Sequence, residues 1–167
     1  SVKENKEKIL DFISNSNNKV IFLNINNYLP HDIGKATIVS HEIRVFLDAA
    51  FYNKLTHPLI IPMKGLGQLI GNQIEDVEIY DYGLNLKQGS FKIREKSCEL
   101  DSTVVAGYAL ALCTRAGAKK INIVGFDGYQ ENDIRFQEMS SIFERYLSLE
   151  ESIEVVSLTP TIYPIKT

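Results

Sequence analysis

The chain contains no tryptophan, only two cysteines and no long apolar run. A membrane-spanning helix needs about 20 consecutive apolar residues, so we predict no membrane contact. Cys98 and Cys113 lack the spacing of a metal site, and we expect both to be reduced and structural. Residues 1–7 are charged, which is typical of a helix start rather than of a signal peptide. These absences together predict a soluble, cytoplasmic protein.

Neither positive nor negative charge dominates the sequence. The net charge is −3, and the 18 lysine and arginine residues are scattered along the chain. A nucleic-acid backbone needs an extended cationic face, so we predict no nucleic-acid partner. The three histidines, His31, His41 and His57, have no supporting carboxylates at ligand spacing. We therefore predict no metal ion.

The sequence does contain enough apolar residues for a single core. Its 167 residues, 44% of them hydrophobic, fit one domain spanning 1–167. Helical periodicity alternates with short β-branched runs, which favours an α/β fold, a three-layer Rossmann-like sandwich whose mostly parallel sheet is covered by helices on both faces. We expect helices at 3–14, 104–116 and 133–149, a helix or turn at 41–51, strands at 19–25, 35–40, 59–62, 77–80, 121–125 and 153–158, and an irregular segment at 159–164. Residues 84–99 stay open between a loop and a hairpin.

The most informative segment is 116–129, where a helix end, a buried strand and an acidic loop follow one another. Gly117 ends the central helix, because glycine adopts the left-handed conformation without a Cβ penalty. Ligands of open α/β sheets bind beyond the carboxyl ends of the strands. Asp127 follows such an end and is the leading ligand-binding candidate, with Gly125, Gly128 and the aromatic Tyr129 beside it.

Each polar candidate has both a functional and a local interpretation. The Asp127 carboxylate either hydrogen-bonds a ribose or sugar hydroxyl or caps a turn that its flanking glycines permit. Asp101 and Ser102 precede the central helix, where we favour N-terminal capping over the binding of a phosphate or carboxylate. Asn24 and Asn26 follow the first strand, and we favour a local role there over contact with a nucleobase or sugar.

The cationic candidates are His41 and Arg44, at an expected strand-to-helix junction. An arginine fork can bind a phosphate or carboxylate, although most such pairs are merely solvated. The glycine cluster at 64–71 fits neither the dinucleotide fingerprint nor the P-loop, so we predict a plain loop there. No nucleophile with a base and no pair of carboxylates is recognisable from spacing, so the residues indicate a binding site rather than a catalytic one.

Two signatures resemble a known family. They are Asp-Ser-Thr-Val-Val-Ala-Gly-Tyr at 101–108 followed by Ile-Val-Gly-Phe-Asp-Gly-Tyr at 123–129, and Ser-Leu-Thr-Pro-Thr at 157–161. They resemble the C-terminal domain of bacterial proteins whose N-terminal half is an HMG-CoA-lyase-like TIM barrel, often identified as 4-hydroxy-2-oxovalerate aldolase. The resemblance implies a barrel partner in the same protein and a setting in surface polysaccharide biosynthesis. We expect no cofactor in this domain, and a nucleotide or nucleotide sugar is the candidate ligand.

The resemblance extends to the first strand, Val-Ile-Phe-Leu-Asn-Ile-Asn at 20–26. In that family a strand and a Gly-Pro-Ser turn precede the first helix, so the resemblance implies that this sequence is a fragment of a longer chain. The central pattern is also remotely similar to bacterial sialyltransferases that use a CMP-activated sugar. Glu95 stands where those enzymes carry a catalytic histidine, so the similarity does not extend to their catalytic residues.

The sequence thus predicts an accessory ligand-binding domain that performs no bond chemistry itself, with its site around Asp127. One alternative is a transferase of nucleotide-activated sugars, with His41 or Glu95 as base and Arg44 near the phosphate. Another is a non-catalytic dimerisation or docking module. These three classes differ in whether turnover, binding or assembly depends on the candidate residues.

Overall fold

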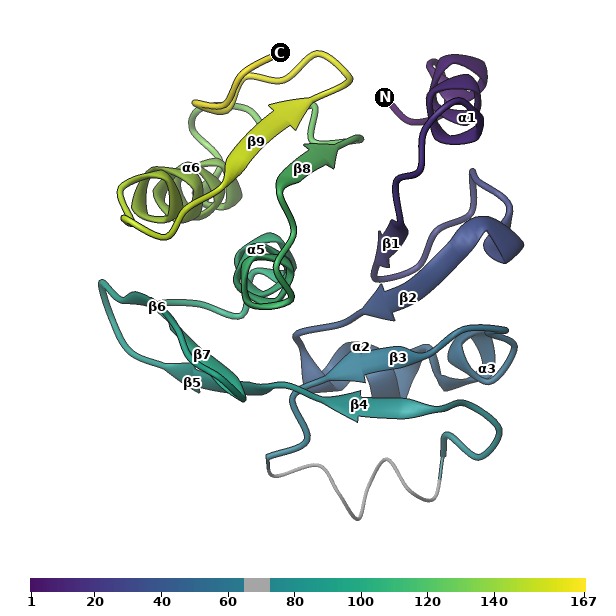
Figure 1. Cartoon of the computed structure of the whole chain (residues 1–167). Helices are drawn as coiled ribbons and strands as arrows, with labels where there is room; N and C mark the ends of the chain where they lie inside the picture. The colour runs from purple at the N-terminus through teal and green to yellow at the C-terminus, as the bar shows by residue number, and fades with distance from the viewer. Residues whose placement is uncertain (65–72) are drawn as a thin grey trace.

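The computed structural model describes residues 1–64 and 73–167. As predicted, the chain forms a Rossmann-like α/β domain in which mostly parallel strands lie between helices (Figure 1). Backbone hydrogen bonds divide the described strands into three groups rather than one sheet.

The largest group is a sheet of four parallel strands. In spatial order they are β1 (Val20–Leu23), β2 (Gly34–Ile38), β3 (Leu59–Ile61) and β4 (Ile79–Asp81). Ile38, Leu59 and Ile61, on the two interior strands, are fully buried. Burial on both faces is the reason that parallel strands are continuous apolar runs in sequence, and these strands overlap the runs that predicted them.

Two further strands are parallel to each other, and they confirm the expected strands at 121–125 and 153–158. They are β8 (Lys120–Ile123) and β9 (Glu154–Ser157). In their register, Ile121 lies opposite Val155. β8 therefore ends directly before the loop that carries Asp127.

The segment that the sequence left open forms the third group. Its strands are β5 (Gly83–Leu86), β6 (Phe91–Ile93) and β7 (Ser97–Leu100). β6 and β7 are an antiparallel hairpin, and β5 pairs with β7 in parallel. Of the two interpretations of 84–99, the hairpin is the one the structure confirms.

The described helices are α1 (Lys6–Ser14), α2 (Glu42–Leu47), α3 (Ala49–Tyr52), α5 (Val105–Arg115), α6 (Ile134–Leu147) and a 3-10 turn, η1 (His31–Ile33). The expected helix or turn at 41–51 is two short helices that meet at Asp48. Gly117, with φ at +77°, follows the end of α5 as predicted. None of the helices in 1–64 and 73–167 is both long and apolar enough to span a bilayer.

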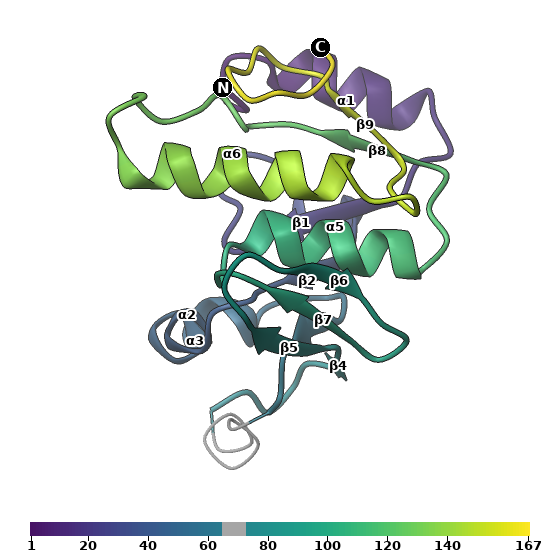
Figure 2. The ribbon, with the colours of Figure 1, turned by 90° about the vertical axis from the view of Figure 1, so that its left-hand side faces the viewer.

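The main core lies around α5, which contacts β1, β6, β7 and α6 (Figure 2). Tyr108 on α5 and Phe143 on α6 are almost fully buried in it. A Cβ placed on Gly107 would lie 3.0 Å from Ile142, so glycine lets α5 and α6 approach closely. On the other side of β1, Phe22 packs with Ile9 of α1 in a smaller cluster. Helices therefore cover β1 on both faces.

Candidate functional site

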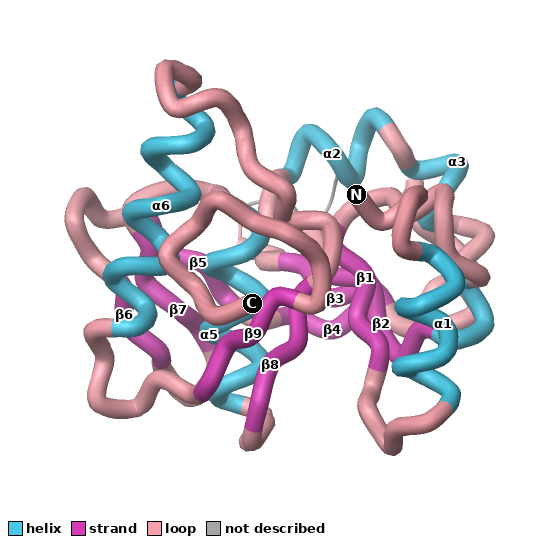
Figure 3. The backbone as a smooth tube through the Cα atoms, turned by 90° about the horizontal axis from the view of Figure 1, so that it is seen from above, coloured by secondary structure: helices cyan, strands magenta, loops and turns pink. Residues whose placement is uncertain are grey.

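The carboxyl ends of β1 and β8 point to the same side of the molecule, where the amino terminus and α2 also lie (Figures 2 and 3). The Ser40 hydroxyl, just after β2, donates a hydrogen bond of 2.5 Å to the carbonyl of Thr103, just before α5. This bond joins the end of the four-stranded sheet to the N-terminus of the central helix. We call this side, where the parallel strands end, the carboxyl edge. Open α/β sheets bind their ligands there.

Asp127 lies on this edge in a loop shaped by two glycines. Gly125 has φ at +79° and Gly128 at +110°, a region that residues with a Cβ rarely adopt. The Thr159 hydroxyl accepts the N–H of Gly125 at 3.1 Å and fixes the start of the loop. The Asp127 side chain is 44% exposed, and its carboxylate lies 3.2 Å from the amino group of Ser1.

The Asp127 carboxylate accepts no hydrogen bond from its own loop within the described residues. The turn-capping interpretation of Asp127 therefore finds no support in the geometry. Hydrogen bonding to Glu4 and the proximity of Asp127 raise the pKa of the Ser1 amino group, so this nitrogen is positively charged at neutral pH. Asp127 thus already holds a cationic group at the sheet edge.

Tyr129 completes the loop. The guanidinium carbon of Arg135 lies 4.3 Å from the centre of the Tyr129 ring, in a cation–π contact. Arg135 also forms an ion pair with Asp133, 2.6 Å between nitrogen and oxygen, and the pKa of Asp133 is lowered by this partner. Because Asp133 caps α6, accepting the Arg135 N–H at 2.9 Å, the aromatic ring is anchored to a helix N-terminus.

The prediction that Asp101 and Ser102 cap α5 is wrong. The N-cap residue is Val104, and no side chain makes the capping hydrogen bond. Asp101 instead forms an ion pair with Arg145 of α6 at 3.2 Å. The Ser102 hydroxyl is buried and has no hydrogen-bond partner among the described residues. The helix begins too far along the chain for either side chain to reach its first free N–H groups.

The two asparagines after β1 have different roles. Asn26 forms a local turn: its side-chain oxygen accepts the N–H groups of Tyr28 and Leu29, and its amide donates to the Leu29 carbonyl at 2.8 Å. This confirms the local interpretation for Asn26. Asn24 has φ at +55°, a left-handed conformation that is uncommon outside glycine. Its side chain makes no hydrogen bond in the described part of the chain, so it is free to face a ligand.

His41 and Arg44 have partners on their own helix. His41 caps α2, its Nδ1 accepting the Ile43 N–H at 3.3 Å. Arg44 lies 3.9 Å from Asp48 and is largely exposed. The structure therefore places both residues at the carboxyl edge but gives neither a contact with Asp127.

Glu95 lies far from the candidate loop. It occupies the turn between β6 and β7 and lines a shallow surface hollow together with Arg94, Arg115 and Glu151. Gly117, which precedes β8, lines the same hollow, whereas Asp127 follows the opposite end of β8. Glu95 is therefore not brought to the carboxyl edge where the transferase hypothesis needs its base.

The sequence did not predict several of the hydrogen bonds that hold the carboxyl edge together. Ser40, Thr103 and Thr159 organise the edge, and their partners are up to 63 residues away along the chain. Only their types, small hydroxyl residues beside strand or helix ends, signalled a role. The glycine cluster at 64–71 lies outside the described residues except for Lys64.

Burial changes the pKa values of His57 and of both cysteines. His57 is buried and shares a hydrogen bond of 2.8 Å with Thr37, and desolvation lowers its pKa. Burial raises the pKa of the Cys98 and Cys113 thiols to about 12 and about 11, which is typical of unreactive cysteines. Within 1–64 and 73–167, no three histidine, cysteine or acidic residues are grouped to hold a metal ion.

At this edge Asp127 has an exposed carboxylate and Asn24 has an amide without a hydrogen bond among the described residues, whereas the Ser102 hydroxyl is buried. Carboxylate and amide oxygens accept hydrogen bonds from hydroxyl groups, and the amide also donates. This arrangement can bind and orient a polar ligand. Comparison of the chain with protein-family models, with curated proteins and with solved structures found no match.

Proposed function

We propose that this domain binds a hydroxyl-bearing small molecule, of the nucleotide or nucleotide-sugar class, at the carboxyl edge of its strands and performs no bond chemistry itself. The observation that carries the proposal is the loop of Asp127. Two glycines in left-handed conformations keep its carboxylate exposed and without a partner from its own loop. An acid at the end of a strand is well suited to accept hydrogen bonds from a ribose or sugar.

The wider setting of the proposal comes from the resemblance to aldolase-associated domains. It favours an accessory domain of a longer lyase in surface polysaccharide biosynthesis, with a TIM barrel as its covalent partner. The distance of Glu95 from the carboxyl edge weighs against sugar transfer with that residue as base. Binding without turnover is therefore the expected behaviour.

Calorimetric titration with nucleotides, nucleotide sugars and 2-oxo acids tests the proposal. We expect one class to bind, and Asp127→Asn to weaken its Kd about tenfold, because a hydrogen bond to a charged group contributes about 1.4 kcal/mol. Asp11→Asn, on the exposed side of α1, is the matched control and should leave the Kd unchanged. Equal affinity of the Asp127→Asn variant and the control, or turnover of a nucleotide sugar, would contradict the proposal.

A docking role is the second candidate, because α2 exposes large apolar side chains. Ile43, Phe46 and Leu47 are 59%, 55% and 71% exposed. If this face mediates assembly, the mass measured by analytical ultracentrifugation should fall to that of a monomer in Phe46→Ser. Leu86→Ser, at an equally exposed apolar position on β5, is the control. A monomeric wild-type protein at all concentrations would exclude self-association through α2.

A further inference from the structure

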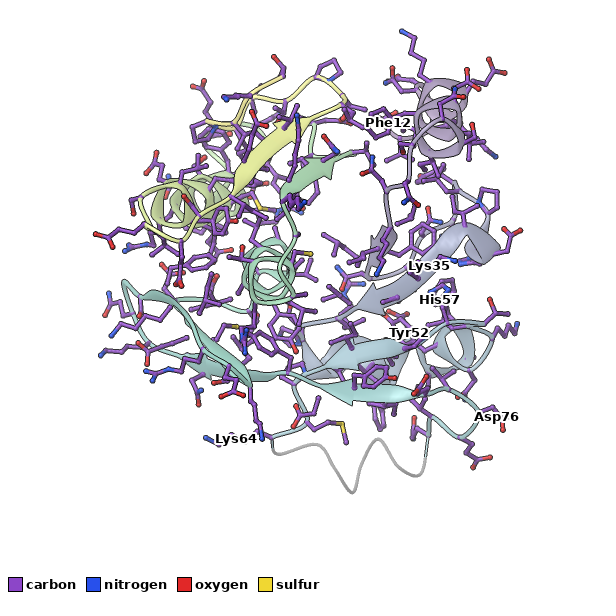
Figure 4. All side chains as sticks on the ribbon, in the orientation of Figure 1. Phe12, Lys35, Tyr52, His57, Lys64 and Asp76 are labelled. Atoms are coloured by element: carbon purple, nitrogen blue, oxygen red, sulfur yellow. The ribbon has the colours of Figure 1, made fainter. Side chains whose placement is uncertain are left out.

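Two histidines pack against the same phenylalanine ring, near the start of β2 and β3. His31 belongs to η1 and His57 precedes β3, and their ring centres lie 6.0 Å and 5.8 Å from that of Phe22 on β1. The His31 ring also meets Phe51 of α3 edge-on, with 5.3 Å between the ring centres. Figure 4 shows His57 at the beginning of β3, next to α3. The two imidazoles therefore share one aromatic cluster, at the end of the sheet opposite the carboxyl edge.

Each of the two rings has a buried nitrogen without a partner in the described part of the chain. His57 is 8% exposed; its Nε2 shares a hydrogen bond of 2.8 Å with Thr37, whereas its Nδ1 is unpaired. The Nδ1 of His31 is also buried and unpaired. A Cβ placed on Gly34 would lie 2.8 Å from the His57 ring, so the packing there is tight. Both nitrogens of an imidazolium ring are donors, so protonation leaves a buried N–H without an acceptor.

No opposite charge compensates a protonated ring in this cluster. The charged or titratable side chains on the neighbouring elements are those of Lys19 before β1, Asp32 of η1, Lys35 of β2, and Asp48, Tyr52 and Lys54 at α3. In 1–64 and 73–167 none of them forms an ion pair or a hydrogen bond with either histidine. Burial lowers the pKa of His57, the His31 carbonyl raises it, and the charge of the His31 ring lowers it. The cluster therefore favours the neutral form of His57, and a charge on His31 adds repulsion.

His31 lies near the end of the segment that connects β1 to β2. We call residues 24–33 the crossover, because they return the chain from the end of β1 to the start of the parallel strand β2. Asn24 begins the crossover at the carboxyl edge, and the turn of Asn26 is bonded only to residues of the crossover itself. Leu29 is buried. The packing of Leu29 and of the His31 ring therefore holds the crossover against the sheet.

We propose that His31 and His57 form a pH-sensitive latch, which keeps the crossover packed on the sheet while both rings are neutral and releases it when they are protonated. His31 is the more exposed of the two and lies on the crossover, whereas His57 directly precedes β3, so the crossover is the part that moves. After release, water hydrates both imidazolium groups, which the closed cluster cannot do. The latch concerns the packing of β1, β2 and α3 and is independent of the proposed ligand.

NMR relaxation measured between about pH 7.5 and pH 5 tests the latch, since histidine titrates in this range. We expect the order parameters of the amides in residues 27–33 to fall from about 0.85 to below about 0.6. The fall should have the same midpoint as the ring titrations of His31 and His57. Phe143, in the core around α5, should stay at about 0.85, which separates release of the crossover from unfolding. The exposed His41 is the internal reference for a histidine outside the cluster.

His31→Phe keeps an aromatic ring against Phe22 but cannot take up a proton. One proton instead of two then favours the released state, so we expect the midpoint of release to move at least about half a pH unit lower. Lys35→Gln is the matched control, because it removes one positive charge from an exposed position on β2 without touching either ring. Its midpoint should equal that of the wild type.

Each outcome decides the question. Release of residues 27–33 together with the two ring titrations, at a lower pH in His31→Phe and at an unchanged pH in Lys35→Gln, supports the proposal. A crossover that stays rigid while His57 titrates, or that loosens only together with Phe143, overturns it. Equal midpoints in His31→Phe and the wild type, or no protonation of His57 above pH 5, also overturns it.

Discussion

Replacing Tyr146 with phenylalanine removes a buried hydroxyl that links three segments. Tyr146 of α6 is fully buried; its hydroxyl shares a hydrogen bond of 2.7 Å with Thr114 of α5 and accepts the N–H of Ile153 at 3.1 Å. Loss of these bonds leaves the Ile153 N–H unpaired, at a cost of about 2 kcal/mol. For a chain of this size we expect Tm to fall by roughly 6 °C, at about 3 °C per kcal/mol.

Tyr52→Phe is the matched control, since Tyr52 is also fully buried but its hydroxyl has no hydrogen-bond partner in the described part of the chain. Figure 4 shows Tyr52 in the region of β3 and α3. We expect its free energy of unfolding to stay the same or to rise, because no hydrogen bond is lost and an unpaired buried hydroxyl is removed. Urea and thermal unfolding measure both variants. If Tyr52→Phe costs as much as Tyr146→Phe, the loss of hydrogen bonds does not explain the effect.

Two further predictions concern pH and backbone conformation. Burial lowers the pKa of His57, so the unfolded chain takes up a proton at this site more readily, and the stability from neutral His57 is present above about pH 6.5 and is lost as pH falls below it. Calorimetry between pH 7 and 5 should therefore show a steeper fall in Tm for the wild type than for His57→Gln, and equal slopes would refute the assignment. Gly117→Ala should cost about 1 kcal/mol because φ is +77° while the space around it is open, and Gly117→Asn should cost less. Equal urea midpoints for the two Gly117 variants would count against a conformational cause.

The sequence predicted the fold best where local signals agree. Between 104 and 125, an alanine- and leucine-rich helix, a terminating glycine and a β-branched strand follow one another, and α5, Gly117 and β8 match them closely. The segment 84–99 could not be decided, because its strands are only three or four residues long. β5 pairs with β7 rather than with its nearer neighbour β6, a choice that depends on tertiary packing.

In the candidate site, too, the sequence predicted best the contacts between residues that are close together along the chain. The turn of Asn26 involves residues within three positions, so its local role could be predicted. The partner of Asp101 is Arg145, on another helix, and nothing in the local sequence indicates it. Asp127 was placed at the carboxyl edge because the position of a loop after a strand is a property of the whole fold class.

Two hydrogen bonds hold the N-terminal part of α5 against the segments that follow β2 and β4, and they have a consequence for motion. Ser40, after β2, is bound to Thr103 at the start of α5, and one turn later the buried Tyr108 hydroxyl donates to the carbonyl of Tyr82, after β4. The helix and the four-stranded sheet are thereby fixed to each other at two points, and neither can rotate as a hinge without breaking a buried bond. We therefore expect this half of the edge to be preformed. Any rearrangement that accompanies ligand binding should occur in the loop after β8.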